Sequence, residues 1–275
     1  RGVRWLRDYR YTWAAVGIAL LLAVFVLGDE VNGARLSIRL GPVSGQPSEL
    51  LKVILVVFLA AYLADNRPLL ARASLRIGPI ALPPLPYLLP MLAMWGLAVG
   101  LVIVQRDLGA AFLLFGVFLA LLYIATRRAS YVVVGVTLAV VAGAVLYQSV
   151  DHVQTRIDVW LDPWADPLGD GYQLIQALHA FARGGLLGTG LGAGLPTIDG
   201  RLPVPAVHTD FPLAAIGEEL GMTGVVAVLA AYLVIVQRGL RVAASAADDS
   251  RALLAAGLAL VVGVQAAIIA AGNLK

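Results

Sequence analysis

Seven long apolar runs, each near the length of about 20 residues that crosses a lipid bilayer, dominate the sequence. Shorter segments rich in Arg, Asp, Pro and Gly separate them. The runs are Tyr11 to Gly28, Glu49 to Ala64, Leu82 to Val104, Leu108 to Thr126, Tyr131 to Tyr147, Pro212 to Val236 and Ala252 to Gly272. Because only helices satisfy their own backbone in an apolar solvent, this pattern predicts an all-α, polytopic transmembrane helix bundle.

One connection, residues 148–211, is far longer than a simple turn and is predicted to form a large loop within a single membrane domain spanning residues 1–275. Arginine sets topology, because cytoplasmic loops carry the excess of positive charge. If the first run passes outward, twelve arginines lie inside and six outside, which makes this loop extracytoplasmic. The inner set is Arg1, Arg4, Arg7, Arg10, Arg67, Arg72, Arg76, Arg127, Arg128, Arg238, Arg241 and Arg251.

Composition agrees with a membrane protein, since 60% of residues are hydrophobic, 13% are charged and the mean hydropathy is +0.87. The absence of cysteine excludes a disulfide framework, a thiolate nucleophile and a Cys-ligated metal from these residues. The sequence opens on Arg1 rather than Met and stops at Lys275 directly after an apolar run. We therefore expect it to be the middle of a larger bundle.

The long loop mixes acids with aromatic residues such as Trp160, Trp164 and Tyr172. Aromatic rings stack on sugars and carboxylates accept sugar hydroxyls, but tryptophans also form interfacial belts, so both interpretations stay open. The glycine run Gly184 to Gly194 resembles a phosphate loop only in composition. A flexible or close-packed backbone is the favoured interpretation, although its N–H groups could cradle a diphosphate.

Asp210 is the strongest candidate for chemistry. It lies in the segment Pro203 to Phe211, at the mouth of the sixth apolar run. An ionised carboxylate at the edge of the membrane costs free energy, so it must be paired with a cation, hydrated in a cavity or employed in function. A metal site built from His208 and Asp210 is a weaker alternative, and we predict no dedicated metal site.

Two further groups of charged residues lie in or beside the apolar runs. Glu49 and Lys52 are three residues apart, on one helical face, where they can neutralise each other. The pair could fix helix packing or mark a substrate or ion pathway. Glu218 and Glu219 lie about two turns below Asp210, and carboxylates there need a cation or hold a proton.

The order of short motifs resembles the SEDS family of shape, elongation, division and sporulation proteins, of the RodA and FtsW type, over nearly the whole chain. The motifs are Asn32-Gly33-Ala34, Gln46 to Lys52, Gln105 to Gly109, Arg156 to Pro163, Gly171 to Gln173, Gly184 to Gly192, His208 to Phe211 and Glu218 to Gly221. The family has ten transmembrane helices, so the seven runs would correspond to its third through ninth.

The resemblance implies a peptidoglycan glycosyltransferase of the bacterial cytoplasmic membrane that polymerises lipid II, an undecaprenyl-diphosphate-linked disaccharide peptide, on the outer face. Asp210 matches the family's essential acid and would act as general base. Lys52, Arg156 and Arg39 would assist the leaving diphosphate, with Mg²⁺ or Mn²⁺ as a further candidate. The other expected substrate contacts are Glu49, Gln173, His208, Thr209, Asp107 and Glu218.

The resemblance also implies a protein partner, a class B penicillin-binding protein that crosslinks the glycan, and no nucleic acid. Small residues in the sixth run could receive the partner's transmembrane helix or a missing helix of the same protein. They are Gly221, Gly224, Ala227, Ala230 and Ala231. A lipid-linked-sugar flippase and a non-catalytic scaffold are the alternative functions.

Overall fold

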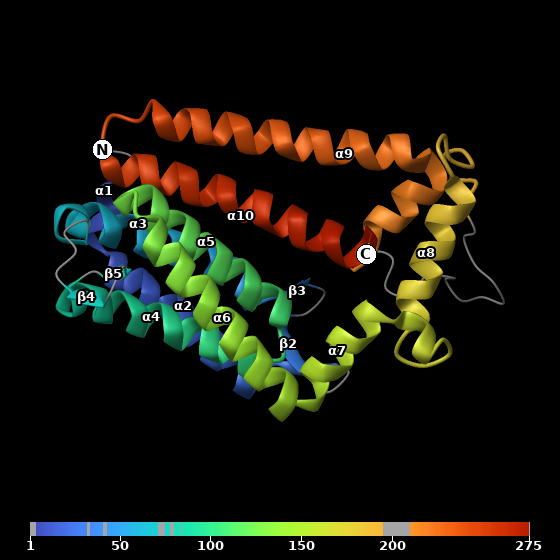
Figure 1. The fold of residues 1–275 in the computed structure, drawn as a ribbon, viewed down its shortest axis with the longest axis horizontal. Coiled ribbons are helices and arrows are strands. Elements are labelled where there is room, and N and C mark those ends of the chain that lie inside the picture. The colour runs from blue at the N-terminus through green and yellow to red at the C-terminus, as the bar shows by residue number, and fades with distance from the viewer. Residues whose placement is uncertain are drawn as a thin grey trace. The chain divides into compact units, whose positions relative to one another are not determined.

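The computed structural model describes residues 4–31, 34–40, 43–70, 75–77, 80–82, 84–194 and 210–274. It confirms the helical bundle and all seven expected spans. These are α2 (Arg10–Leu27), α3 (Pro47–Leu70), α4 (Leu85–Val104), α5 (Leu108–Thr126), α6 (Ala129–Ser149), α9 (Pro212–Ala244) and α10 (Asp249–Leu274) (Figure 1).

The chain divides into two compact units. The first holds residues 1–136 and 236–264, and the second holds residues 137–235 and 265–275.

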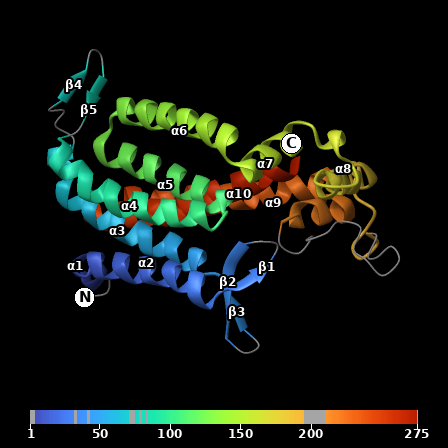
Figure 2. The same ribbon diagram turned by 90° about the horizontal axis from the view of Figure 1, so that it is seen from below.

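In the first unit, α3 is the central helix. It packs on α2, α4 and α5, which lie beside one another in Figure 2, and 72% of its most apolar window is buried. Gly17 of α2 leaves room for Leu51 and Ile54 of α3, and Gly257 of α10 does the same for Val56. Small residues thus permit close helix approach, as expected in a membrane.

The short helix α1 (Arg4–Asp8) precedes α2, and ion pairs cluster at the ends of the spans that carry the inner arginines. Arg7 and Arg10 both pair with Asp65 of α3. Arg67 pairs with Asp249 and donates to the carbonyl of Ala125. These contacts tie α1, α2, α5 and α10 to one end of α3.

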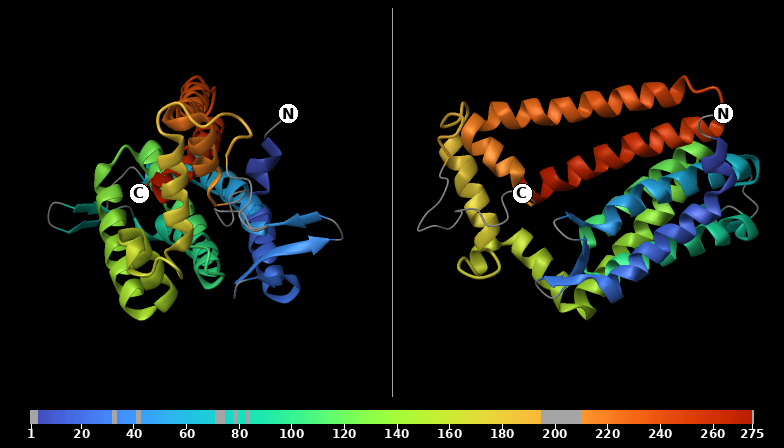
Figure 3. Two further views of the ribbon diagram at one scale, coloured as in Figure 1. Left: turned by 90° about the vertical axis from the view of Figure 1, so that its right-hand side faces the viewer. Right: turned by 180° about the vertical axis from the view of Figure 1, so that it is seen from behind.

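Short strands were not expected from the sequence. β1 (Asp29–Val31), β2 (Ala34–Leu40) and β3 (Val43–Gly45) form an antiparallel sheet between α2 and α3. β4 (Leu75–Ile77) and β5 (Ile80–Leu82) form a hairpin between α3 and α4. Figure 3 shows both outside the helix cluster. They close the connections between spans and leave the helical fold class intact.

In the second unit, the long loop contains secondary structure of its own. α7 (Asp151–Leu161), the 3₁₀ helix η1 (Pro163–Ala165) and α8 (Tyr172–Gly184) follow one another. Asp162 caps η1 by accepting from the backbone N–H of Trp164 at 3.1 Å. Ala177 and Ala180 of α8 pack on Ala214 of α9, with Phe181 and Phe211 beside them.

Candidate functional site

The N-terminal end of α3 carries the predicted ion pair. Lys52 Nζ lies 2.6 Å from Glu49 Oε1, and the Lys52 side chain is only 6% exposed while that of Glu49 is 56% exposed. Neutralisation across one helical turn is therefore confirmed. The buried ammonium is balanced by a carboxylate that water still reaches.

Asp107 links α3 to α5. Its carboxylate accepts from the backbone N–H of Ala110 at 3.0 Å, which caps α5. It also accepts from Gln46 Nε2 at 3.1 Å and from Ser48 Oγ at 3.5 Å. Ser48 lies in the first turn of its own helix, which begins at Pro47. With three protein donors, Asp107 connects the start of α3 to the start of α5.

α9 is broken at Gly221, where φ is 69° and ψ is −172°. This conformation belongs essentially to glycine. The break leaves backbone groups of Glu218, Glu219, Met222 and Thr223 without their usual partners four residues away.

The glycine run supplies the missing partners. Met222 N donates to Gly185 O at 2.9 Å and Thr223 N donates to Leu186 O at 3.2 Å. In return, Glu218 O accepts from Thr189 N and Glu219 O accepts from Gly190 N, both at 3.0 Å. A side chain at Gly188 would collide with the carbonyl of Glu219. The run is thus close-packed backbone, as favoured from the sequence.

Glu218 has the cation that its position requires. Arg183, at the end of α8, donates to Glu218 Oε1 at 2.9 Å, and Glu218 is 7% exposed. Sequence reasoning missed Arg183, because 35 positions separate it from Glu218. The available signal was a single arginine at the end of an otherwise uncharged amphipathic segment, Tyr172–Gly184.

Asp210 precedes α9 in a turn and is exposed. Asn273, near the end of α10, donates through Nδ2 to the carbonyl oxygens of Asp210 and Ile269, each at 3.0 Å. Asn273 is only 3% exposed, and its Oδ1 has no hydrogen-bond partner among the described residues. No pattern in the sequence connects these two residues, and Asn273 was missed.

The remaining candidate residues lie on several elements. Arg156 on α7 and Gln173 on α8 are exposed. Arg39 lies in β2. His208 and Thr209 lie outside the described residues.

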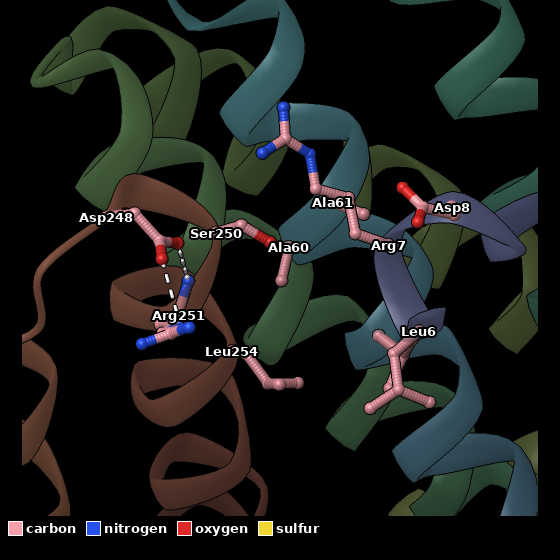
Figure 4. Close-up of a pocket in the computed structure, with 10 residues that line it drawn as sticks. Leu6, Arg7, Asp8, Ala60, Ala61, Asp248, Ser250, Arg251 and Leu254 are labelled. Carbon is pink, nitrogen blue, oxygen red and sulfur yellow. Dashed lines mark hydrogen bonds and ion pairs between the residues drawn. The ribbon is translucent and has the colours of Figure 1, made fainter. Parts of the chain in front are cut away.

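A pocket of about 280 Å³ opens between α1, α3 and α10 in the first unit. Figure 4 shows its lining, with Asp248 and Arg251 joined as an ion pair at 3.1 Å. Arg7 at the same pocket is paired with Asp65. No candidate site residue lines this pocket, and its two arginines are already neutralised.

Comparison with known proteins gives the family. The sequence model of the FTSW_RODA_SPOVE family, described as cell cycle protein, matches residues 3–274. The chain belongs to this family. The resemblance drawn from the motifs is therefore confirmed, and the protein is a multi-pass membrane protein.

Curated relatives carry the same family names. The chain is 42% identical over 272 residues to peptidoglycan glycosyltransferase RodA of Mycobacterium tuberculosis, covering 98% of this chain and 57% of the relative. It is 34% identical over 262 residues to the probable peptidoglycan glycosyltransferase FtsW of Geobacter metallireducens, covering 94% and 66%. The chain thus spans 57% of the length of its mycobacterial relatives.

Solved structures agree with the fold. A chain from a peptidoglycan synthase complex, described for its coordination of polymerization and crosslinking, aligns at 27% identity with a TM-score of 0.75, covering 98% of this chain and 72% of that one. The rod shape determining protein RodA of Thermus thermophilus aligns at 25% identity with a TM-score of 0.59, covering 94% and 64%.

Proposed function

We propose that this chain forms part of a glycosyltransferase that polymerises lipid II at the outer face of the bacterial cytoplasmic membrane. The observation that carries the proposal is Asp210, an exposed carboxylate whose backbone is fixed at the entrance of α9. The names of the curated relatives support the reaction class.

In the proposed reaction, the 4-hydroxyl of the acceptor GlcNAc attacks the anomeric carbon of the donor MurNAc. The bond from that carbon to the diphosphate oxygen breaks, and its electron pair leaves with undecaprenyl diphosphate. Asp210 takes the hydroxyl proton as the new bond forms, because a hydroxyl is a weak nucleophile.

Cationic side chains would stabilise the charge that develops on the diphosphate. Lys52 is a strong candidate because it is buried yet compensated by the hydrated Glu49. Arg156 is exposed on α7, and Arg39 lies in the sheet beside the start of α3. Gln173, His208 and Thr209 are proposed contacts to the sugar or peptide.

The roles of Asp107 and Glu218 in this proposal differ from those expected from the sequence. Both were expected to touch substrate, but each carboxylate already accepts from protein donors. We assign them to holding helix ends in position.

A divalent cation has no dedicated site among the described residues, where no three His, Asp or Glu side chains come together. Mg²⁺ commonly binds through one or two carboxylates together with substrate phosphates. A cation in this reaction would accordingly enter with the diphosphate, and no step of the proposed mechanism depends on it.

The test is glycan-chain formation from purified lipid II by the full-length protein. Asp210→Ala should abolish it, since a general base contributes about 10² to 10⁴ in rate. Asp170→Ala, which removes another exposed carboxylate of the same loop, is the matched control and should retain activity. Wild-type activity in a well-folded Asp210→Ala protein would overturn the assignment. Lipid II translocation without chain formation would favour a flippase instead.

A further inference from the structure

The loop that repairs the break in α9 carries unusually exposed apolar side chains. Leu186 is 75% exposed and Leu187 is 82% exposed, although neither lies in a membrane-spanning helix. Exposed apolar patches outside spans indicate a contact with another apolar phase. Their positions within the second unit show which phase that is.

The backbone contacts fix the depth of these leucines. Leu186 O accepts from Thr223 N and Gly185 O accepts from Met222 N, so the loop lies level with the first turn after the break (Figure 1). The next charged residue along α9 is Arg238, on the inner side of the membrane.

A helical rise of 1.5 Å per residue puts Met222 about 24 Å from Arg238 along α9. The hydrocarbon core of a bilayer is about 30 Å thick. Met222 and the loop bonded to it therefore lie near the outer boundary of the hydrocarbon.

The polar groups at this level behave as a low-dielectric environment demands. Irregular backbone that faces lipid does not occur within the hydrocarbon core, so the exposed loop backbone belongs at the outer boundary of that core. Here the four groups freed by the break bond to the glycine run, and the buried Glu218 is neutralised by Arg183. The exposed side chains of Leu186 and Leu187 lie beside backbone groups that are already hydrogen-bonded within the protein.

We propose that the segment Gly184–Gly194 lies at the outer boundary of the hydrocarbon core, with the Leu186 and Leu187 side chains in contact with phospholipid acyl chains. The segment is a part of the protein that contacts the membrane, contrary to the expectation that residues 148–211 are wholly extracytoplasmic. This inference does not depend on the role of Asp210.

Site-directed spin labelling tests it in the full-length protein, in nanodiscs of phosphatidylethanolamine and phosphatidylglycerol. Residues 1–275 contain no cysteine, so Leu187→Cys supplies one label site in this part of the protein; any cysteine outside it is first replaced. Leu186→Cys is the second site. We expect both labels to collide more often with dissolved oxygen than with a water-soluble nickel chelate.

Leu168→Cys is the matched control, because Leu168 is 90% exposed but lies between the exposed Asp166 and Asp170. Its label should favour the nickel chelate. A Leu187 label that matches the Leu168 label would place the loop in water and overturn the proposal. A label immobilised and shielded from both reagents would also overturn it, because protein would then cover the loop.

Discussion

The backbone of Asp210 is held by one buried amide, that of Asn273. Asn273 donates to the Asp210 carbonyl at 3.0 Å from the last turn of α10. A reacting group misplaced by about 1 Å can lose about a hundredfold in rate. Asn273 is therefore expected to act as a positioning residue for the proposed base.

We predict that Asn273→Leu lowers the turnover of lipid II polymerisation by about fivefold to a hundredfold, while the KM for lipid II changes little. The substitution keeps the branching at Cγ, adds some volume, and removes both donated hydrogen bonds. Steady-state kinetics on purified, well-folded protein measures the two parameters separately.

Asn66→Leu is the control for this prediction. Asn66 Nδ2 also donates to a carbonyl four residues back, that of Tyr62, but has no link to Asp210. It should retain wild-type turnover. Equal loss in the two variants would mean that Asn273 contributes only to folding.

The Lys52 side chain is buried and the Glu49 side chain is exposed. A substitution of Lys52 can therefore distinguish a role in activity from a role in stability. Lys52→Met puts an apolar chain of similar length into a buried position and leaves behind a Glu49 side chain that is 56% exposed and can be hydrated. We predict a thermal midpoint close to wild type with at least about tenfold lower activity, and a smaller loss in Lys52→Arg. Full activity in Lys52→Met would limit Lys52 to packing.

Among the elements, the spans were predictable and the break in α9 was not. Hydropathy alone locates seven helices, because each must cover the same membrane thickness. The stretch Glu218 to Gly221 is compatible with a continuous helix. Its break depends on tertiary bonds from Gly185, Leu186, Thr189 and Gly190, which no local pattern contains. The strands β1, β3, β4 and β5 were missed because a run of three residues carries little periodicity.

Gly221→Ala tests the break. The backbone at Gly221 has φ 69°, and a Cβ there would collide with the carbonyl of Leu186 and the nitrogen of Gly188. We predict a loss of about 3 kcal/mol or more in stability. The measurement is the thermal midpoint of the detergent-solubilised protein by fluorescence-detected size exclusion.

Gly143→Ala is the matched control, because a Cβ at Gly143 in α6 meets no atom within 4 Å. Helix propensity favours alanine there by up to about 1 kcal/mol, so its midpoint should not fall. An unchanged midpoint in Gly221→Ala would show that α9 can straighten without the glycine loop.

At the scale of the whole molecule, the candidate site was predictable only residue by residue. The pair Glu49 and Lys52 followed from spacing, and Asp210 followed from its place before an apolar run. The hydrogen bonds from Gln46 to Asp107 and from Asn273 to the Asp210 carbonyl join positions about 60 residues apart. Such contacts are set by packing between helices and have no signature in one sequence.

The expected partner surface on α9 needs a correction. Gly221 is buried in the break against Leu186, and a Cβ at Gly224 would meet Leu220 of the same helix. The absence of a side chain at these two positions is thus explained by contacts within this chain. Ala227, Ala230 and Ala231 are exposed and remain available for a second helix.

We predict that the transmembrane helix of a class B penicillin-binding protein packs on this alanine surface. A solved structure that resembles this chain, from a peptidoglycan synthase complex, supports such an assembly. In cells that co-express both full-length proteins, a cysteine at Ala231 should crosslink to a cysteine series along the partner's helix with a period near 3.6 residues. Val140→Cys is the control, because Val140 is 67% exposed on another span and should give no crosslink. Crosslinks from Ala231 confined to helices of its own protein would show that an internal helix, and no transpeptidase, covers the surface.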